Sequence, residues 1–297
     1  MGNKAPTLRQ FQDRFPTEGS CLEHLMRVRY GDRHDCAKCG KSAHFYRAKG
    51  RRSYACEYCG HQVYPTAGTP FDRTRTSLRD WFYVMFLFCT TRNGVAAKEV
   101  ERQLGVTYKT AWRMCHEIRK YMGDVDGDEP IGGAGSAVEI DETFIGGRMA
   151  RGKRGGNPAE GKAIVLGMVE RGGELITEVV PNRKRATIFP IVRTSVQRYS
   201  EVHTDEYHTY DTIGAMPGMA YTHRSVNHAF KEYATPCGKG INTLEGFWAQ
   251  LKRGINGTHI HVSQKHFPKY LGEFEYRWNM RHAPHLMLDR LVYSFSR

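Results

Sequence analysis

The stretch VEIDETFIGG (138–147) reads as a buried strand that carries acids at its end. Val138 and Ile140 alternate with charged positions, which is typical of a β-strand that turns one face to a core. Asp141 and Glu142 then follow directly. A carboxylate beside a core loses hydration, and this cost must be offset by a partner such as a metal, a base or a substrate cation. The stretch therefore predicts a functional site where a strand ends.

The segments that follow predict a mixed α/β domain. A strand, a hairpin, a helix and a fourth strand are expected at 138–145, 162–171 with 173–181, 184–196 and 200–205. The fourth strand also ends on an acid, Asp205. If these two acid-ending strands are neighbours, Asp141 and Asp205 repel by about 4 kcal/mol at an effective dielectric of 20. A divalent cation removes that repulsion, and Mg²⁺ combines carboxylates with waters and substrate phosphates.

A predicted helix late in the chain offers a third acid. In INTLEGFWAQLKRGING (241–257) the apolar positions at helical spacing are Leu244, Trp248, Leu251 and Ile255. A second stripe of the same helix holds Asn242, Glu245, Ala249 and Lys252. Glu245 can bind a metal from this stripe, and Lys252 can bind a phosphate. Taken alone, such a stripe is equally typical of a solvated, salt-bridged surface.

Four cysteines near the N-terminus have metal-ligand spacing. They form a C-x2-C-x16-C-x2-C pattern, made of Cys36, Cys39, Cys56 and Cys59. Each pair forms a tight turn that aims two thiolates at one point, and two such turns complete a tetrahedron around Zn²⁺. The intervening residues alternate as a β-hairpin does, so the unit reads as a zinc ribbon. Four thiolates leave no open position, which makes this zinc structural rather than catalytic.

The region 77–122 changes to helical spacing. Two short helices joined by LGVT, with a second helix that carries basic residues, predict a helix-turn-helix DNA-binding motif. Its polar side chains are Tyr108, Lys109, Arg113 and Arg119. The alternative is a plain helical linker. The acidic, glycine-rich segment 123–137 then predicts a flexible connection.

Composition favours a polyanionic partner. The 297 residues include 44 Lys and Arg against 31 Asp and Glu, a net charge of +13, which favours nucleic acid over a membrane surface. The longest apolar run, 81–89, is too short to cross a bilayer, and the N-terminus lacks a signal-peptide core, so a cytoplasmic, nucleoid-associated protein is expected. The near P-loop at 156–163 lacks its hydroxyl residue and precedes a strand, which argues against an NTPase. The basic loop 146–162, with Arg148, suits contact with a phosphate backbone.

The motifs EIDETFIGGR, HTDEYHTYD and NTLEGFWAQLKRGINGTHIHVSQKHF, after a ribbon of paired cysteines, resemble the DDE-type transposases of bacterial insertion sequences that carry an N-terminal zinc ribbon. The resemblance implies an RNase H-like catalytic domain in which Asp141, Asp205 and Glu245 hold the catalytic metal. Lys252 matches the basic residue that often follows the third acid. Some relatives use asparagine as the third ligand, so Asn242 is the alternative to Glu245.

The activity implied by this resemblance is metal-dependent cleavage at transposon ends followed by transfer of the 3′-hydroxyl into target DNA. Two Mg²⁺ or Mn²⁺ ions would serve the phosphoryl transfer beside a structural Zn²⁺. Lys252, Arg253 and Arg148 would bind the DNA, and joining two ends requires at least a dimer. The alternatives are a non-catalytic zinc-ribbon and helix-turn-helix regulator, or a two-metal nuclease without strand transfer.

The sequence predicts a multidomain α+β protein with this order of parts. The zinc ribbon is expected in 1–70, the helix-turn-helix in 71–125 and the RNase H-like mixed α/β catalytic domain in 126–297. The expected partners are double-stranded DNA, both as terminal inverted repeats and as target, and a second copy of the chain. No membrane partner is expected.

Overall fold

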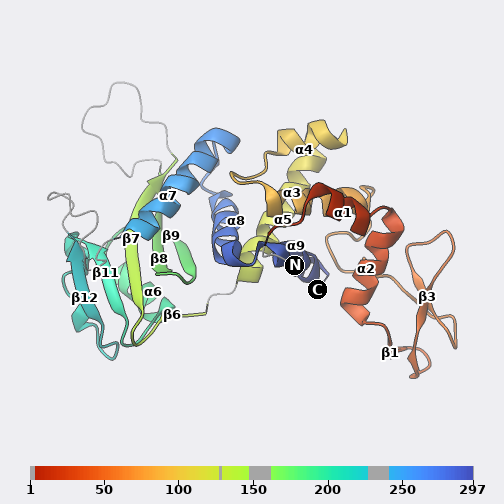
Figure 1. Ribbon diagram of the computed structural model, residues 1–297, viewed down its shortest axis with the longest axis horizontal. Helices are drawn as coiled ribbons and strands as arrows, with labels where there is room; N and C mark the ends of the chain where they lie inside the picture. Colours follow the sequence, from red (N-terminus) through yellow and green to blue (C-terminus); the bar gives the residue numbers. More distant parts are fainter. Residues whose placement is uncertain (1–3, 127–128, 147–161, 227–240, 297) are drawn as a thin grey trace. The chain divides into compact units, whose positions relative to one another are not determined.

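The structure is a computed structural model that describes residues 4–126, 129–146, 162–226 and 241–296. Its contacts divide the chain into two compact units, one formed by residues 1–125 with 282–297 and the other by residues 126–281. Figure 1 labels all the α-helices and most of the longer strands of both units.

Polar caps begin the helices of the first unit. Thr7, Thr17 and Ser77 each use a hydroxyl to accept an N–H group from the first turn of the helix that follows. These three helices, with the next two, are α1 (Leu8–Arg14), α2 (Glu18–Tyr30), α3 (Leu78–Thr90), α4 (Ala97–Leu104) and α5 (Tyr108–Asp126). Gly105 ends α4 in the left-handed backbone region (φ 64°), where glycine is favoured. Helices are therefore present throughout the predicted helical region.

The last of these helices differs from its prediction in two respects. Arg119, predicted as a polar residue of a DNA-reading helix, is only 2% exposed. Its guanidinium donates to the Val95 carbonyl oxygen at 2.7 Å and lies over the Phe88 ring, so it holds the helices together. The predicted linker 123–137 is also shorter than expected, because α5 continues to Asp126 and β6 (Ile131–Gly132) already pairs with β10 (Val196–Gln197).

The C-terminal helix α9 (Met287–Phe295) belongs to the first unit. Its Phe295 ring lies 5.5 Å from Phe71 and 4.2 Å from Tyr121, between ring centres. Residues 282–297 were predicted as part of the catalytic domain, and the structure groups them with the N-terminal helices instead. The physical reason is that the apolar face of α9 is buried among aromatic side chains of that unit.

The ribbon consists of two small antiparallel arrangements. β1 (His34–Asp35) pairs with β2 (Ser42–Ala43), and β3 (Phe45–Arg47), β4 (Tyr54–Cys56) and β5 (Gln62–Val63) form a three-stranded sheet. The hairpin predicted between the two cysteine pairs is thus confirmed.

The second unit is built on a five-stranded sheet in the order β12-β11-β7-β8-β9. Its strands are β7 (Ala137–Ile145), β8 (Ala163–Glu170), β9 (Leu175–Val180), β11 (Glu201–Asp205) and β12 (Thr222–Val226). The first three in the chain are antiparallel neighbours, and β11 and β12 run parallel to β7. This arrangement confirms the predicted RNase H-like mixed α/β class.

Helices cover both faces of the sheet (Figure 1). α6 (Arg185–Ser195) packs Ile188 and Val192 on one face, while α7 (Asn242–Gly254) and α8 (Phe267–Asn279) pack on the other. β8 is buried along almost its whole length, as expected for a strand covered on both sides. On its face of the sheet, α7 contacts β7, the strand that carries Asp141.

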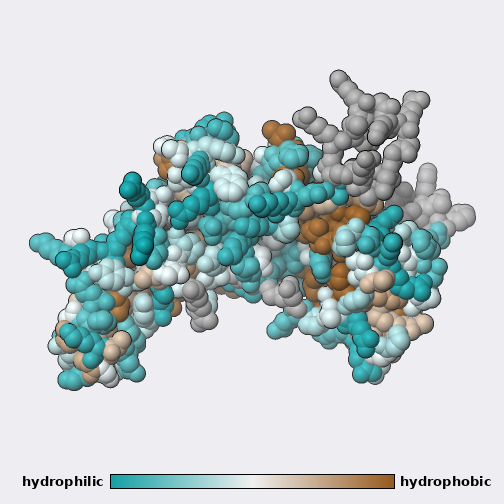
Figure 2. All heavy atoms as spheres, turned by 180° about the vertical axis from the view of Figure 1, so that it is seen from behind, coloured by the Kyte–Doolittle hydropathy of each residue, from teal (hydrophilic) through white to brown (hydrophobic). Residues whose placement is uncertain are grey.

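Hydrophilic side chains cover most of the face shown in Figure 2, as expected for a chain of this net charge. Among the described residues, no helix has the length and apolar character needed to span a membrane.

Candidate active site and metal-binding residues

Two neighbouring parallel strands position the first two acids. On β7 and β11, Val138 lies opposite Val202 and Glu139 opposite His203. Continuing this register by two residues brings Asp141 level with Asp205. Side chains alternate along a strand, so both acids share the face on which Glu139 and His203 lie. The two strands are thus neighbours, which is the condition under which the sequence brings Asp141 and Asp205 together. The expectation that both strands end on their acids holds for Asp205 only, because β7 continues beyond Asp141 to Ile145 and pairs with β8 along that stretch.

Asp141 is held against α7 by a tryptophan. The indole N–H of Trp248 donates to the Asp141 carboxylate at 3.1 Å. Gly167, on β8, lies directly opposite Asp141. A Cβ atom on Gly167 would lie 2.6 Å from the Trp248 ring. Only glycine at this position lets the helix approach so closely. The strand and helix therefore fix the acid between them.

The charges of the other two acids act on Asp141. Burial, and then the charge of Asp205, raise the pKa of Asp141 to about 6, with a smaller contribution from Glu245. Hydrogen bonds from the Glu142 backbone and from Trp248 act in the opposite direction. The site thus concentrates negative charge that a cation would neutralise.

The three carboxylates do not form a closed coordination sphere. In the part of the chain that the structure describes, the only group of three or more Cys, His, Asp or Glu ligand atoms within 4.8 Å of one another is the cysteine cluster. The acids lie close enough to interact electrostatically, yet further apart than a single ion requires. Their oxygen donors suit hard divalent cations in chemistry.

Glu139 has a different role from the acids beside it. Its buried carboxylate accepts hydrogen bonds from the Thr243 hydroxyl at 2.9 Å and the Leu244 backbone N–H at 3.0 Å, and pairs with Arg171 at 2.9 Å. It therefore fixes the first turn of α7 to β7. In the sequence, strand alternation places Glu139 and Asp141 on one side of the strand, and this pattern is the only local signal from which the anchor could have been found.

Glu142 faces the opposite side of β7 from Asp141, because side chains alternate along a strand. Burial raises its pKa to about 7, the nearby Tyr210 hydroxyl and the Arg183 charge lower it, and the charges of Asp141 and Asp205 raise it further. It lies on the α6 side of the sheet and is not part of the α7-facing acids.

The candidates for the third ligand both lie in the first turn of α7. Asn242 is exposed, whereas Glu245 is half-buried and its charge contributes to the raised pKa of Asp141. Lys252 and Arg253 are exposed in the last turn of the same helix. Arg148, the third predicted DNA-binding residue, lies outside the described residues.

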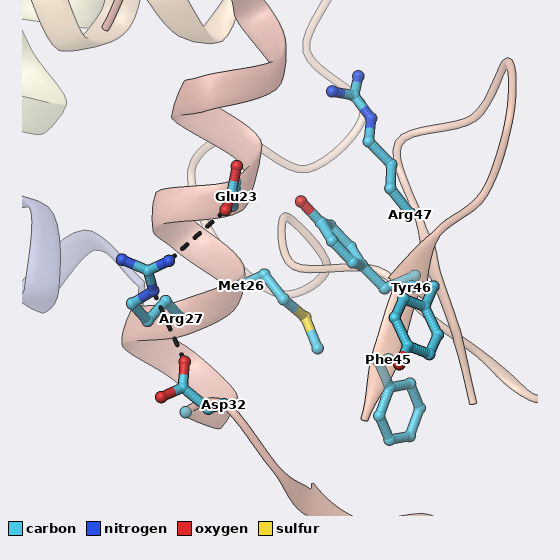
Figure 3. A pocket seen from close by; sticks show the side chains of 9 residues that line it. Glu23, Met26, Arg27, Asp32, Phe45, Tyr46 and Arg47 are labelled. Carbon is cyan, nitrogen blue, oxygen red and sulfur yellow. Dashed lines mark ion pairs between the residues drawn. The ribbon is translucent and has the colours of Figure 1, made fainter. Parts of the chain in front are cut away.

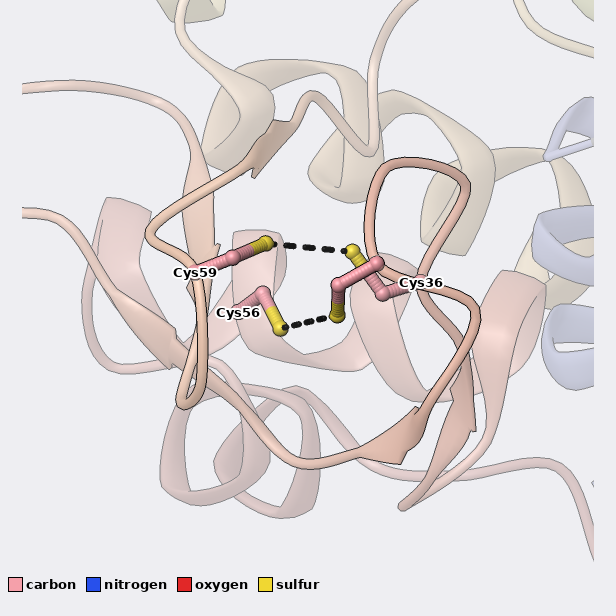
Figure 4. Close-up of side chains that lie close together, drawn as sticks. Cys36, Cys56 and Cys59 are labelled. Carbon is pink, nitrogen blue, oxygen red and sulfur yellow. Dashed lines mark hydrogen bonds between the residues drawn. The ribbon is translucent and has the colours of Figure 1, made fainter.

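The four ribbon sulfurs converge (Figure 4). The Sγ atoms of Cys36 and Cys59 are 3.6 Å apart, and those of Cys39 and Cys56 are 3.9 Å apart. A tetrahedron with Zn–S bonds of ~2.3 Å has sulfurs about 3.8 Å apart, so the spacing fits Zn²⁺. Backbone N–H groups, that of Cys39 first, lower the pKa of the Cys36 thiol to about 6. Against a backbone hydrogen bond at His61, burial and the neighbouring sulfurs raise the pKa of the Cys59 thiol to about 11, as expected where several thiolates crowd together without a cation.

A pocket of about 300 Å³ lies between α2 and the ribbon strands β3 and β4 (Figure 3). The acids at its edge, Glu23 and Asp32, flank Arg27 at 3.5 and 3.7 Å. Tyr46, on β3, is 63% exposed and stands beside Arg47. The charges of Glu23, Arg27 and Asp32 are therefore paired here, unlike the concentrated acids of the sheet.

Two family models match successive parts of the chain. A family model described as an ISXO2-like transposase domain matches residues 133–279, and one described as a transposase zinc-ribbon domain matches residues 16–62. The solved structure of a pre-cleavage Mos1 transpososome is similar with a TM-score of 0.31 and 10% identity, over 73% of this chain and 79% of that one.

Two curated relatives are similar in sequence. An uncharacterized protein in transposable element ISH50 of Halobacterium salinarum is 26% identical over 291 residues, 91% of this chain and 94% of the relative. An uncharacterized transposase-like protein of Haemophilus influenzae is 33% identical over 109 residues, 36% of this chain and 81% of the relative. The resemblance predicted from the sequence motifs is thereby confirmed. A ribbon followed by an acid-bearing sheet, matched in that order by both models, places this chain in the ISXO2-like transposase family.

Proposed function

We propose that the chain cleaves DNA at transposon ends and joins the exposed 3′-hydroxyl to target DNA, with Asp141, Asp205 and Glu245 as the metal ligands. The observation that carries this proposal is the register of β7 and β11, which sets two aspartates level on the face that α7 covers. Glu245 is the third ligand in this proposal, because a charged carboxylate binds a hard cation better than the Asn242 amide and because Glu245 is half-buried where Asn242 is exposed.

Bound Mg²⁺ or Mn²⁺, two ions in this proposal, would supply charge neutralisation for the phosphoryl transfer at these carboxylates. The chain itself performs the positioning. Trp248 fixes the orientation of the Asp141 carboxylate, and Glu139 holds the helix turn from which Glu245 projects. Lys252 and Arg253, exposed in the last turn of α7, would bind the DNA backbone and set its position without reading sequence.

The test is a strand-transfer reaction with a labelled transposon end and Mg²⁺. Asp141→Ala, Asp205→Ala and Glu245→Ala, tested separately, each abolish cleavage and joining, while Asn242→Ala retains both. If Asn242→Ala is inactive and Glu245→Ala is active, the third ligand is Asn242. Wild-type protein that only hydrolyses the end would be a nuclease, and protein that binds without cutting would be a regulator.

The first unit would supply DNA recognition. The cysteine cluster would hold a structural Zn²⁺, and the ribbon adds exposed tyrosines with basic neighbours, such as Tyr58 with the Lys41 ammonium 4.9 Å from its ring centre. Tyr108, Lys109 and Arg113 are exposed on α5, as a DNA-reading helix requires. These modules would bind the terminal inverted repeats, and two copies of the chain would bring two ends together.

A further inference from the structure

Arg183 is held between two aromatic rings in the sheet unit. It follows β9 and precedes α6, and its guanidinium carbon lies 4.2 Å from the centre of the Tyr207 ring and 5.0 Å from that of Phe144. Its backbone carbonyl oxygen accepts a hydrogen bond from the buried Thr209 hydroxyl at 2.9 Å. Both the backbone and the side chain of this arginine are therefore fixed.

One ring lies on the strand of Asp141, and the other lies two residues beyond the strand of Asp205. Phe144 lies three residues beyond Asp141 on β7, and the backbone N–H of Tyr207 donates to the Asp205 carboxylate at 3.0 Å. β7, β9 and β11 run in the same direction, so their carboxyl ends meet at one edge of the sheet. Arg183 is thus placed at the edge where Asp205 ends its strand.

The hydrogen-bonding capacity of this guanidinium is unused within the described residues. No ion pair or hydrogen bond joins the Arg183 side chain to any of them, although it is half-buried. Stacking leaves the N–H groups at the rim of the planar group free to donate, and ring contacts limit its rotation. A guanidinium is the side chain best matched to a phosphate, because its fork can make two parallel hydrogen bonds.

We propose that Arg183 binds a phosphate of the DNA strand that lies at the acids. The proposal rests on the proposed function for the presence of DNA at this edge, and it adds a contact on the α6 side of the sheet to those of α7. A purely internal role, in which Arg183 only offsets the charge of Glu142, is the competing explanation. The two differ in whether DNA binding depends on this arginine.

The experiment compares Arg183→Met with Arg198→Met. The methionine retains an unbranched apolar stem and removes the charge. Arg198 is a matched control, because it is an exposed arginine that lies over one ring, Tyr199 at 5.2 Å, and it precedes the amino end of β11 at the opposite edge of the sheet. Circular dichroism and thermal unfolding confirm that both variants are folded.

Affinity for a 30-base-pair duplex of scrambled sequence (about three helical turns) is measured over a range of salt concentrations. Loss of one phosphate contact makes the plot of log affinity against log salt less steep by about 0.9 and weakens binding about tenfold at low salt. Arg183→Met shows this change, Arg183→Lys shows a smaller loss because it keeps the charge, and Arg198→Met matches the wild type. An unchanged slope in folded Arg183→Met overturns the assignment.

A second measurement locates the phosphate and separates the two proposals. On a duplex that ends in the inverted repeat flanking the gene, single phosphates are replaced by neutral methylphosphonates. We expect one replacement to weaken DNA binding by the wild type without weakening binding by Arg183→Met. If the same replacements weaken binding by both proteins equally, the inference is overturned. The proposed function fails if the wild type binds the repeat no more tightly than scrambled DNA and if Asp141→Ala cleaves as well as the wild type. In that case the salt dependence of binding to scrambled DNA still decides whether Arg183 binds a phosphate.

Discussion

At the scale of the residue, the site is defined by what each acid has beside it. Asp141, Glu139 and Glu142 lie within one strand, yet one is oriented by a tryptophan, one is bound to a helix turn and one faces the opposite side of the sheet. Burial raises the pKa of Asp141 and of Glu142, because a buried carboxylate without a cation is costly. Measurements on single side chains therefore test the site without requiring DNA.

Asp141→Asn should stabilise the metal-free protein at neutral pH. The carboxyl has a pKa of about 6 in the folded protein against an ordinary value of 3.8. Between these values the folded state holds a proton that the unfolded chain has lost, so stability falls as the pH rises through this window and stays lowered above it. We expect a gain of roughly 1–3 kcal/mol at about pH 7.5 and none near pH 3.5, measured by urea unfolding.

The same variant tests metal binding independently of activity. Excess Mg²⁺ should raise the unfolding free energy of the wild type, because an ion that binds only the folded state stabilises it, and should leave Asp141→Asn unchanged. Equal stabilisation of both proteins would contradict the assignment of Asp141 as a ligand.

Gly167→Ala should destabilise the sheet unit through a single methyl group. The added Cβ would meet the Trp248 ring at 2.6 Å, so α7 must move, at a cost of about 1–3 kcal/mol. Gly246→Ala is the control, since Gly246 lies in α7 with nothing within 4 Å of the place its added Cβ would occupy, and alanine favours a helix by ~1 kcal/mol. Thermal unfolding of both variants provides the comparison, and equal effects would exclude the close approach.

At the scale of the element, α7 is placed by its first turn. In this turn the Thr243 hydroxyl and the Leu244 backbone N–H donate hydrogen bonds to the buried Glu139 carboxylate. Arg171 offsets the charge of that carboxylate. A helix begins with N–H groups that lack partners within the helix, and a carboxylate there also interacts favourably with the helix dipole. The position of Glu245 thus depends on an acid from a strand more than a hundred residues earlier.

Glu139→Ala should loosen this turn while leaving the far end of α7 in place. The Leu244 N–H loses its acceptor and Arg171 loses its partner, which we expect to cost about 2–4 kcal/mol. Hydrogen exchange measured by NMR should show faster exchange at Leu244 and little change near Leu251. Glu139→Gln, which can still accept one hydrogen bond, should be intermediate, and uniform exchange along the helix would contradict the anchoring role.

At the scale of the whole molecule, the chain combines a small cysteine ribbon and a group of helices with a large sheet unit. The ribbon and the sheet unit have different sources of stability. The ribbon buries few side chains around its sulfurs, whereas the sheet has apolar cores on both faces. A module with so small a core normally relies on its metal for folding.

Metal removal should therefore affect the two units differently. We expect a single zinc ion per chain, and its removal by a chelator, or Cys36→Ser, should unfold the ribbon and weaken DNA binding. The sheet should keep its thermal transition. Metal analysis, with calorimetry before and after chelation, provides the measurement, and a zinc-free protein with full DNA affinity would contradict a structural zinc.

The sequence by itself determined the local features. Alternation predicted the strand of Asp141, helical spacing predicted α7, and cysteine spacing predicted the ribbon, because each depends on residues near one another in the chain. Only the tertiary structure decided which groups meet. Arg119 is a buried link between helices, α9 belongs to the N-terminal unit, and Glu139 binds the first turn of α7. Arg183 lies between the Phe144 ring of β7 and the Tyr207 ring that follows β11. These contacts join distant segments, and no local periodicity encodes them, since they depend on strand order, register and packing that the whole chain establishes together.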